Sequence, residues 1–304
     1  MRRAAPADSE YRASLLAIWS ALLAVYLIWG STYLAIRYAI ETTPPFLMAA
    51  ARFIVSGGCL YALRRALGDP PPKPMEWRNA AIIGIFLLVG GNGSVVWAEQ
   101  FVPSSLAALL VATVPLWMVL IDALRQAGHR PNLISVLGIL IGFGGVVLLI
   151  GSAARGSETM NLPGAAMLIV ASLSWAVGSL YGRNARLPSS QLLATGMEML
   201  AGGIALLFLG SIVGEWTRLD LAAVSVRSAG ALLYLTVIGS GGFVAYVWLL
   251  RVAPTPLVAT YAYVNPLVAV LLGYILAHEP VTLRTLCAAA LIIGAVALVS
   301  APKR

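Results

Sequence analysis

Ten long apolar runs follow one another along this 304-residue chain, each 19 to 24 residues long and bounded by charges, proline or glycine. A helix needs about 20 apolar residues to cross the hydrocarbon core of a bilayer, whereas a barrel strand would be half as long and would alternate. The runs lie at residues 15–36, 46–66, 79–98, 104–122, 133–151, 162–182, 190–213, 228–249, 255–276 and 282–300. They predict an all-α polytopic membrane protein with ten transmembrane helices.

The charges are few and unevenly placed. Only 11% of the residues are charged and 60% are hydrophobic, which excludes an ordinary soluble enzyme or DNA-binding domain. The net charge of +8 would suggest nucleic acid in a soluble protein, but fourteen of the twenty Lys and Arg fall in segments on one side of the predicted spans and five on the other. We therefore expect a lipid bilayer and no nucleic acid as partner, with both termini in the cytoplasm of a plasma (inner) membrane protein.

The first apolar run is predicted to be a retained helix, because three arginines precede it and no small-residue cleavage site follows. The two cysteines, Cys59 and Cys287, lie inside apolar runs without a second Cys or His at ligand spacing. Neither a disulfide, a metal site nor a cofactor is expected. The oligomeric state is left open, and a monomer is compatible with the sequence.

The chain contains an internal repeat. Residues 102–121 read VPSSLAALLVATVPLWMVLI, and 151 residues later 253–272 read APTPLVATYAYVNPLVAVLL. The same offset superposes Gly90 and Gly91 on Gly241 and Gly242, and Trp97 on Trp248. Apolar character alone does not align prolines, glycines and a tryptophan without gaps, so we predict two homologous halves, 1–152 and 153–304.

Five spans per half is an odd number, so the second half must enter the membrane from the opposite side. Inverted repeats place a binding site at their interface, where rocking can open it to either face of the membrane. This architecture favours a secondary transporter over a channel or a passive scaffold.

These residues resemble the drug/metabolite transporter superfamily, and within it the EamA-type ten-helix exporters. The resemblance covers nearly the whole chain and rests on WGSTY at 29–33, RF at 52–53, GGNG at 90–93, YVNP at 263–266 and EP at 279–280. It implies export of amino acids and related metabolites, as in the broad amino-acid exporter branch. The acidic residue that the family pattern places after the fourth span is Arg130 here.

Two prolines lie within spans at equivalent positions of the two halves. Pro115 and Pro266 each remove a backbone donor and free the carbonyl four residues earlier, at Val111 and Ala262. We favour a hinge that exposes polar backbone to a substrate cavity over a kink satisfied by neighbouring side chains. The mid-span glycines at 90, 91, 93, 239, 241 and 242 indicate close helix packing.

Polar groups inside the spans are candidates for substrate contact or for internal pairing. Asn92 and Asn265 could hold the charged ends of a zwitterion or could hydrogen-bond between helices. Arg52 lies six residues into its span, either as a carboxylate anchor or in a structural pair with Glu99, and the pair is slightly favoured.

Aromatic side chains within the spans or near their ends, on helices that resemble the family's cavity-lining set, predict the specificity surface, because their faces accept apolar groups of many sizes and attract an ammonium group. For Trp97 the alternative is an anchor at the membrane interface. Together with the two asparagines, the predicted substrate-binding set is Tyr33, Asn92, Trp97, Trp175, Tyr246, Tyr261 and Asn265.

The favoured function is export of amino acids of broad specificity, including Phe, Trp, Met and Thr, by alternating access. No span carboxylate was identified for proton coupling, so uniport is a prediction. The alternatives are a nucleotide-sugar or drug/metabolite carrier of the same superfamily and, less favoured, an intramembrane enzyme. An enzyme is disfavoured because His129 and His278 lie at span ends and no catalytic constellation is apparent.

Overall fold

The computed structural model describes residues 14–124, 133–150, 161–253, 255–258 and 260–300. Within these residues all regular secondary structure is helical. The predicted boundary between the halves, at 152, lies outside the described residues, as do Arg130 and His129.

All ten predicted apolar runs are helical, with ends within a few residues of those expected. The helices, in chain order and grouped by span, are α1 (Leu15–Ala39); α2 (Pro45–Ala66); α3 (Pro74–Gly84), η1 (Ile85–Gly93) and α4 (Ser94–Ala98); α5 (Ser104–Val111) and α6 (Val114–Leu124); α7 (Leu133–Ile150); α8 (Leu162–Gly182); α9 (Gln191–Ile212); α10 (Val226–Tyr234), η5 (Leu235–Gly239) and α11 (Ser240–Val252); α12 (Thr255–Val258) and α13 (Tyr261–Ala277); and α14 (Leu283–Ser300). Two short 3₁₀ turns, η3 (Glu215–Arg218) and η4 (Leu221–Ala223), connect α9 to α10.

Helix starts follow local capping chemistry. Ser14, Asn161, Ser190 and Ser225 each accept a backbone hydrogen bond at the start of α1, α8, α9 and α10. Proline occupies the first turn of α2, α3 and α8, where its missing N–H has no partner in any case.

The third and eighth spans both contain a π-helical stretch, and these stretches occupy equivalent places in the two halves. Both η1 and η5 lie between two α-helices, and η5 starts 150 residues after η1. The predicted packing role holds for several mid-span glycines here, because a Cβ on Gly90 would meet Ser174, on Gly91 would meet Trp175, and on Gly242 would meet Trp29, each within 3 Å. π-Helical turns recur at functional sites, so both stretches are candidates for one.

The helix geometry differs at the two prolines that lie within spans. At Pro115 the helix breaks into α5 and α6, and the carbonyl of Leu110 takes hydrogen bonds from Thr113 N, Thr113 Oγ1 and Ser172 Oγ. Pro266 lies inside the continuous helix α13, whose preceding break falls between α12 and α13. The carbonyl bonded at this break is that of Leu110, one residue before the predicted Val111, and the hinge at Pro115 stays a prediction.

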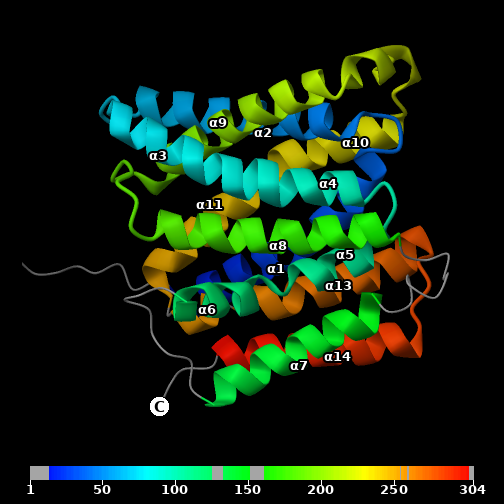
Figure 1. Ribbon diagram of the computed structural model, residues 1–304. Coiled ribbons are helices and arrows are strands. Elements are labelled where there is room, and N and C mark those ends of the chain that lie inside the picture. The colour runs from blue at the N-terminus through cyan, green and yellow to red at the C-terminus, as the bar shows by residue number, and fades with distance from the viewer. Residues whose placement is uncertain (1–13, 125–132, 151–160, 254, 259, 301–304) are drawn as a thin grey trace, which may run out of the picture.

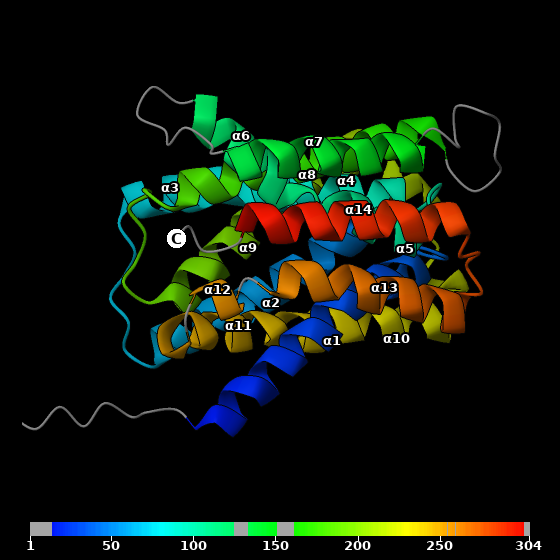
Figure 2. The same cartoon turned by 90° about the horizontal axis from the view of Figure 1, so that it is seen from below.

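The spans form two groups of three that the repeat relates to one another. One group packs α1 against α10–α11 and α13, and the other packs α8 against α3–α4 and α5–α6. Figure 2 shows them as two layers, with α3, α4, α6 and α8 above α1, α10, α11 and α13. The remaining helices form two pairs, α2 with α9 and α7 with α14.

Each helix pair joins equivalent spans of the two halves in antiparallel order. Gly57 approaches Leu200 while Gly203 approaches Ile54, so residue numbers rise along α2 as they fall along α9. The same holds for Gly138 beside Val299 and Gly145 beside Leu291 on α7 and α14. The helices approach closely because these positions have no side chain, and their antiparallel order is the inversion predicted from the odd number of spans.

Candidate functional site

The first candidate site is an aromatic cluster between α1, α11 and α13. The ring centroids of Trp29 and Tyr246 lie 5.1 Å apart, those of Trp29 and Tyr261 5.2 Å, and those of Tyr246 and Tyr261 5.6 Å. Tyr33 lies one turn after Trp29 on α1, within electrostatic reach of Tyr261. The structure thus brings together three of the predicted tyrosines and adds Trp29, which entered the sequence analysis only as part of the WGSTY motif at 29–33.

Asn265 lies one turn after Tyr261 on α13, beside this cluster. It is 8% exposed, and its Oδ1 has no hydrogen-bond partner. Its backbone carbonyl lies against Gly30 of α1, the residue after Trp29, where a Cβ would come within 3.1 Å of the oxygen. Buried polar atoms are normally hydrogen-bonded, so this oxygen is available to accept a hydrogen bond from a ligand bound next to the aromatic rings.

Arg52 is buried in α2 at 5% exposure, and its Nε and Nη1 have no hydrogen-bond partner. The guanidinium lies near Gly239 at the end of η5, where an added Cβ would be 3.7 Å from Nη2 and 3.8 Å from Thr32. Thr32 lies one turn from Trp29, and Gly239 one turn before Gly242, which contacts Trp29. Arg52 is therefore placed at the edge of the aromatic cluster.

The structural pair predicted between Arg52 and Glu99 does not form. Neither Nε nor Nη1 of Arg52 is bonded, and both carboxylate oxygens of Glu99 also lack a hydrogen-bond partner. The charged groups near Glu99 are Arg37 and Glu279. The positions of Arg52 and Glu99 along their spans placed both toward the same side of the membrane. Position along a span could not show that Arg37 of α1 lies beside Glu99 at that end.

The other predicted residues lie in the second group of helices. Trp175 of α8 contacts η1 at Gly91, and the neighbouring Asn92 has a buried Oδ1 without a partner. Trp97, in the last turn of α4, meets the ring of Phe101 edge-on, with ring centroids 5.1 Å apart. The substrate-binding set predicted from the sequence is thus divided between the two layers, with Trp97 nearest to the end of its span.

Glu279 ties several helices together at one end of the bundle, which we call the Glu279 end and which is the right-hand end in Figure 1. Its carboxylate accepts hydrogen bonds from Ser104 N and Oγ at 2.8 Å, from Ser105 N at 2.9 Å and from Arg37 Nη1 at 2.9 Å. It therefore caps the N-terminus of α5 and binds the last turn of α1.

The chain leaves α13 through His278, whose φ of 51° lies in the left-handed region, and Glu279 N bonds back to the carbonyl of Gly273. A Cβ on Gly273 would lie 2.6 Å from Glu279 Oε2, so glycine makes room for the carboxylate. Burial alone would raise the pKa of Glu279, but hydrogen bonds from Ser105 and Ser104 outweigh it and hold the pKa below its ordinary value.

Glu215 performs a similar role at the same end. It follows Gly214, which ends α9 at a φ of 74°, and its carboxylate accepts hydrogen bonds from Phe46 N at 3.2 Å and Leu47 N at 2.8 Å. It thus caps the N-terminus of α2. Further ties between α1 and its neighbours here are Arg227 to Glu41, Ser228 Oγ to the Tyr38 carbonyl and Tyr38 hydroxyl to the Leu276 carbonyl.

Glu99 follows directly after α4 at this end and is 4% exposed. Burial, with the nearby Glu279 charge as a second cause, raises its pKa well above the ordinary value despite the opposing effect of Arg37. The two buried carboxylates differ in that Glu279 has several donors while Glu99 has none.

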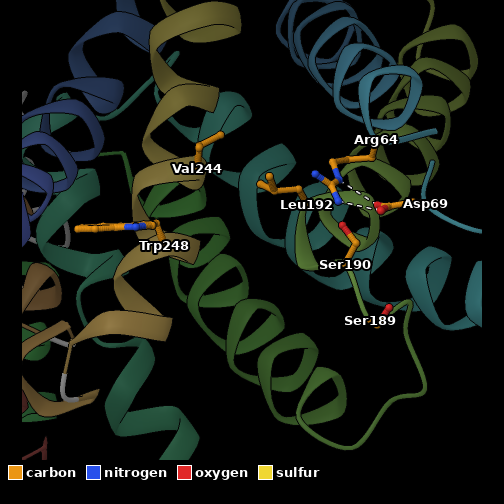
Figure 3. A pocket seen from close by; sticks show the side chains of 7 residues that line it. All are labelled: Arg64, Asp69, Ser189, Ser190, Leu192, Val244 and Trp248. Atoms are coloured by element: carbon orange, nitrogen blue, oxygen red, sulfur yellow. Dashed lines mark hydrogen bonds and ion pairs between the residues drawn. The ribbon is translucent and has the colours of Figure 1, made fainter. Parts of the chain in front are cut away.

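The opposite end, which we call the Asp69 end, contains a pocket of about 420 Å³ that is open to the surroundings. Figure 3 shows Arg64 and Asp69 on one side and Val244 and Trp248 of α11 on the other. Arg64, in the last turn of α2, and Asp69, in the loop that follows, bond each other through two hydrogen bonds of 2.9 and 2.7 Å that do not cross the pocket. Trp248, equivalent to Trp97 in the repeat, therefore lines a mouth of the bundle.

The sequence argument missed Glu198. It lies at the eighth position of α9, the same place that Arg52 holds in α2, and both helices have 22 residues. It was overlooked because the search for a span carboxylate was directed at the first span. An acidic residue within an apolar run was the available signal.

Comparison with known proteins identifies the family to which this architecture belongs. The model of the EamA-like transporter family matches residues 15–151 and 162–301. An uncharacterized inner membrane transporter, YedA of Escherichia coli K12, is 40% identical over 95% of this chain and 92% of its own length.

A more distant relative and a solved structure also match nearly the whole chain. A WAT1-related chloroplastic protein of Arabidopsis thaliana is 24% identical over 94% of this chain and 70% of its own length. A crystal structure with 24% identity covers 94% of this chain and 98% of its own, with a TM-score of 0.61, and shows the same fold. The chain is a membrane transporter that belongs to the EamA-like transporter family, within the drug/metabolite transporter superfamily.

Proposed function

We propose that this transporter exports amino acids across the inner membrane by alternating access, with broad specificity that includes Phe, Trp, Met and Thr. The observation that carries the proposal is the buried guanidinium of Arg52, whose Nε and Nη1 have no hydrogen-bond partner among the described residues. A buried charge without a counter-charge is costly, and the ligand of a transporter is a natural source of the missing anion. A carboxylate offers two oxygens to the guanidinium fork.

The aromatic cluster supports an amino-acid side chain and ammonium group beside that carboxylate. Trp29, Tyr246 and Tyr261 present ring faces and edges to one another within 5.6 Å, and Asn265 adds an unsatisfied acceptor oxygen. Rings of this kind bind apolar groups without strict size selection and attract an ammonium group, which favours broad specificity.

The two ends of the bundle support alternating access. The Glu279 end is closed by ties between spans, whereas the Asp69 end has an open pocket. We propose that this is the inward-open state, with the Asp69 end and both termini in the cytoplasm. The excess of Lys and Arg on that side supports the orientation, and the inner-membrane assignment of YedA supports the location.

The test is uptake into proteoliposomes of labelled Phe, Trp, Met and Thr, with competition by analogues that lack one charged group. We expect saturable uptake, strong competition by compounds that keep the carboxylate, and weak competition by phenethylamine. Arg52→Gln should lower the apparent affinity for Phe about 10- to 100-fold, since hydrogen bonds to a charged group contribute about 1.5–3 kcal/mol.

Arg227→Gln is the matched control, because Arg227 is an exposed arginine paired with Glu41 at the Glu279 end. It should leave the affinity unchanged. No saturable uptake of any of the four amino acids, or equal affinity in Arg52→Gln, would overturn the proposed substrate class.

A further inference from the structure

The two acidic residues of the Glu279 end occupy one buried region but differ in their partners. Glu279 accepts bonds from Ser104, Ser105 and Arg37, whereas Glu99, 4% exposed, has no hydrogen-bond partner on either carboxylate oxygen within the part of the chain that the structure describes. These donors of Ser104, Ser105 and Arg37 are thus already bonded to Glu279. An ionised Glu99 would be a second buried carboxylate beside the first, with no donor of its own.

The groups that face Glu99 come from several elements. α1 contributes Tyr33 and Arg37, and the segment after α13 contributes Glu279. α8 packs on α4, and its apolar side chains Ala165 and Leu168 belong to the same core cluster as Ala98, the residue before Glu99. The cation on α2, Arg52, makes no pair with it. One guanidinium, itself bound to Glu279, is the single described cation near two carboxylates.

The burial of Glu99 belongs to the closed form of this end. Glu99 follows α4, which belongs to one three-helix group, while Arg37 and Glu279 belong to the other group. If the two groups separate here during alternating access, water reaches the carboxyl group and it ionises as an exposed glutamate does. Closing the end again then requires that the carboxylate lose its charge.

We propose that Glu99 is a proton-binding site, and that the Glu279 end closes by taking one proton from the medium on that side. In the closed form the proton forms the O–H bond of the Glu99 carboxylic acid, and on opening it returns to water. Glu279 stays ionised in both forms, because its hydrogen bonds stabilise the carboxylate in the closed form and water does so in the open form. The transport cycle is thereby linked to the proton concentration outside, where the sequence alone predicted uniport.

The sign of the pH dependence follows from the direction of the shift. Because the closed form has the higher pKa for Glu99, closure is favoured at low pH and is lost as the pH rises through that value. Between the pKa values of the open and closed forms, the ratio of closed to open molecules falls about tenfold for each unit of pH.

The test measures closure directly and requires no substrate. Spin labels on Cys introduced at Gln100, next to Glu99, and at Leu276, at the end of α13, report the distance between the two groups in lipid nanodiscs by pulsed EPR. Both positions are exposed, and the native Cys59 and Cys287 are replaced by Ala beforehand. We expect the shorter distance to dominate at low pH and a longer one to grow as the pH rises.

Glu99→Gln, a neutral isostere, should keep the shorter distance at every pH, whereas Glu41→Gln, a matched glutamate of the same end, should respond as the parent does. A parent distance that is constant from pH 5 to 9, or a pH response retained in Glu99→Gln, would overturn the proposal.

If Glu99→Gln does not fold, infrared spectroscopy of the protonated carboxyl group tests the proposal instead. The band of this group should be present in the parent at low pH and weaker in Glu99→Asp at the same pH. A parent spectrum without this band would contradict the proposal. The distances are measured without substrate, so they test Glu99 even if the protein transports no amino acid. The two proposals can therefore be contradicted independently.

Discussion

The two ends of the bundle show opposite uses of charged groups. At the Glu279 end, two buried glutamates cap helix N-termini that belong to other spans, Glu279 at α5 and Glu215 at α2. At the Asp69 end, the half-buried ion pair of Arg64 and Asp69 joins the last turn of α2 to the loop that follows it and borders an open pocket. Buried capping carboxylates hold different spans together, whereas a pair within one short segment leaves the spans free to separate.

The distribution of contacts along the fourth span shows the same difference. Its half near the Glu279 end, α5, packs on α13 and α1 of the opposite group, whereas its other half, α6, packs mainly on α8, α7 and α14. The two groups thus meet at one end and diverge toward the other. The break between α5 and α6, next to Pro115, lies where this change of packing partners occurs.

The largest effect is expected from Glu279→Gln. The amide keeps the volume but removes the charge that binds Arg37 and sets an NH₂ donor against the backbone donors of Ser104 and Ser105. The closed form should lose about 3 kcal/mol, as when one partner of a buried polar network is removed. A fall in the thermal unfolding midpoint in detergent and faster labelling of Cys at position 105, in the cysteine-free background, would both follow. Unchanged labelling would show that Glu279 does not hold this end closed.

A smaller loss is expected from Gly273→Ala, because the new Cβ would lie 2.6 Å from Glu279 Oε2. Displacing the carboxylate or the helix should cost about 1–3 kcal/mol. The control is Gly294→Ala in α14, where no atom lies within 4 Å of the new Cβ. Its unfolding midpoint should stay level or rise slightly, because alanine favours a helix. Equal midpoints for the two variants would contradict the close approach at Gly273.

Glu215→Gln should have a weaker effect than Glu279→Gln. It weakens the cap on α2, where Phe46 N and Leu47 N are the donors, but the glutamine oxygen can still accept one of these bonds. We expect a loss of about 1 kcal/mol, typical of a helix N-cap, measured by the same unfolding midpoint. A loss equal to that of Glu279→Gln would mean that the ion pair with Arg37 contributes little.

The smallest effect is expected from Asp69→Asn at the open end. The hydrogen bonds from Arg64 lower the pKa of Asp69, so the stability that the pair contributes is present above the ordinary aspartate pKa and lost only as the pH falls through the lowered value. Parent and variant should therefore show the same dependence of the unfolding midpoint on pH between 6 and 8. A large difference in that range would show that the pair also restrains the spans around the pocket.

Much of the fold was predictable because bilayer thickness fixes the length of an apolar run. The predicted run 46–66 is the helix Pro45–Ala66, and the predicted run 162–182 is Leu162–Gly182. The third and eighth spans begin two to five residues earlier than predicted, because their first turns carry charges that the apolar criterion omits. The π-helical stretches were not predicted, since the repeated glycines indicate close packing but not the number of residues per turn.

The candidate site was predictable only in part. Tyr33, Tyr246, Tyr261 and Asn265 share one region, as proposed from their place within spans, but Asn92 and Trp175 belong to the opposite layer. The Arg52–Glu99 pair was wrong because depth in the membrane says nothing about which helix faces which. Glu198 was detectable in the sequence and was missed.

By itself, the sequence determined the ten spans, their inversion and the family, because hydrophobic length and a gap-free repeat are properties of the chain alone. Only the tertiary structure decided which charges are paired. The partner of Arg37 is Glu279, 242 residues away, and Glu99 is left without a donor although it lies nearby. Side-chain pairing depends on how the helices rotate and pack, and every apolar helix in a membrane satisfies the hydrophobic pattern equally well whichever face it turns to its neighbours.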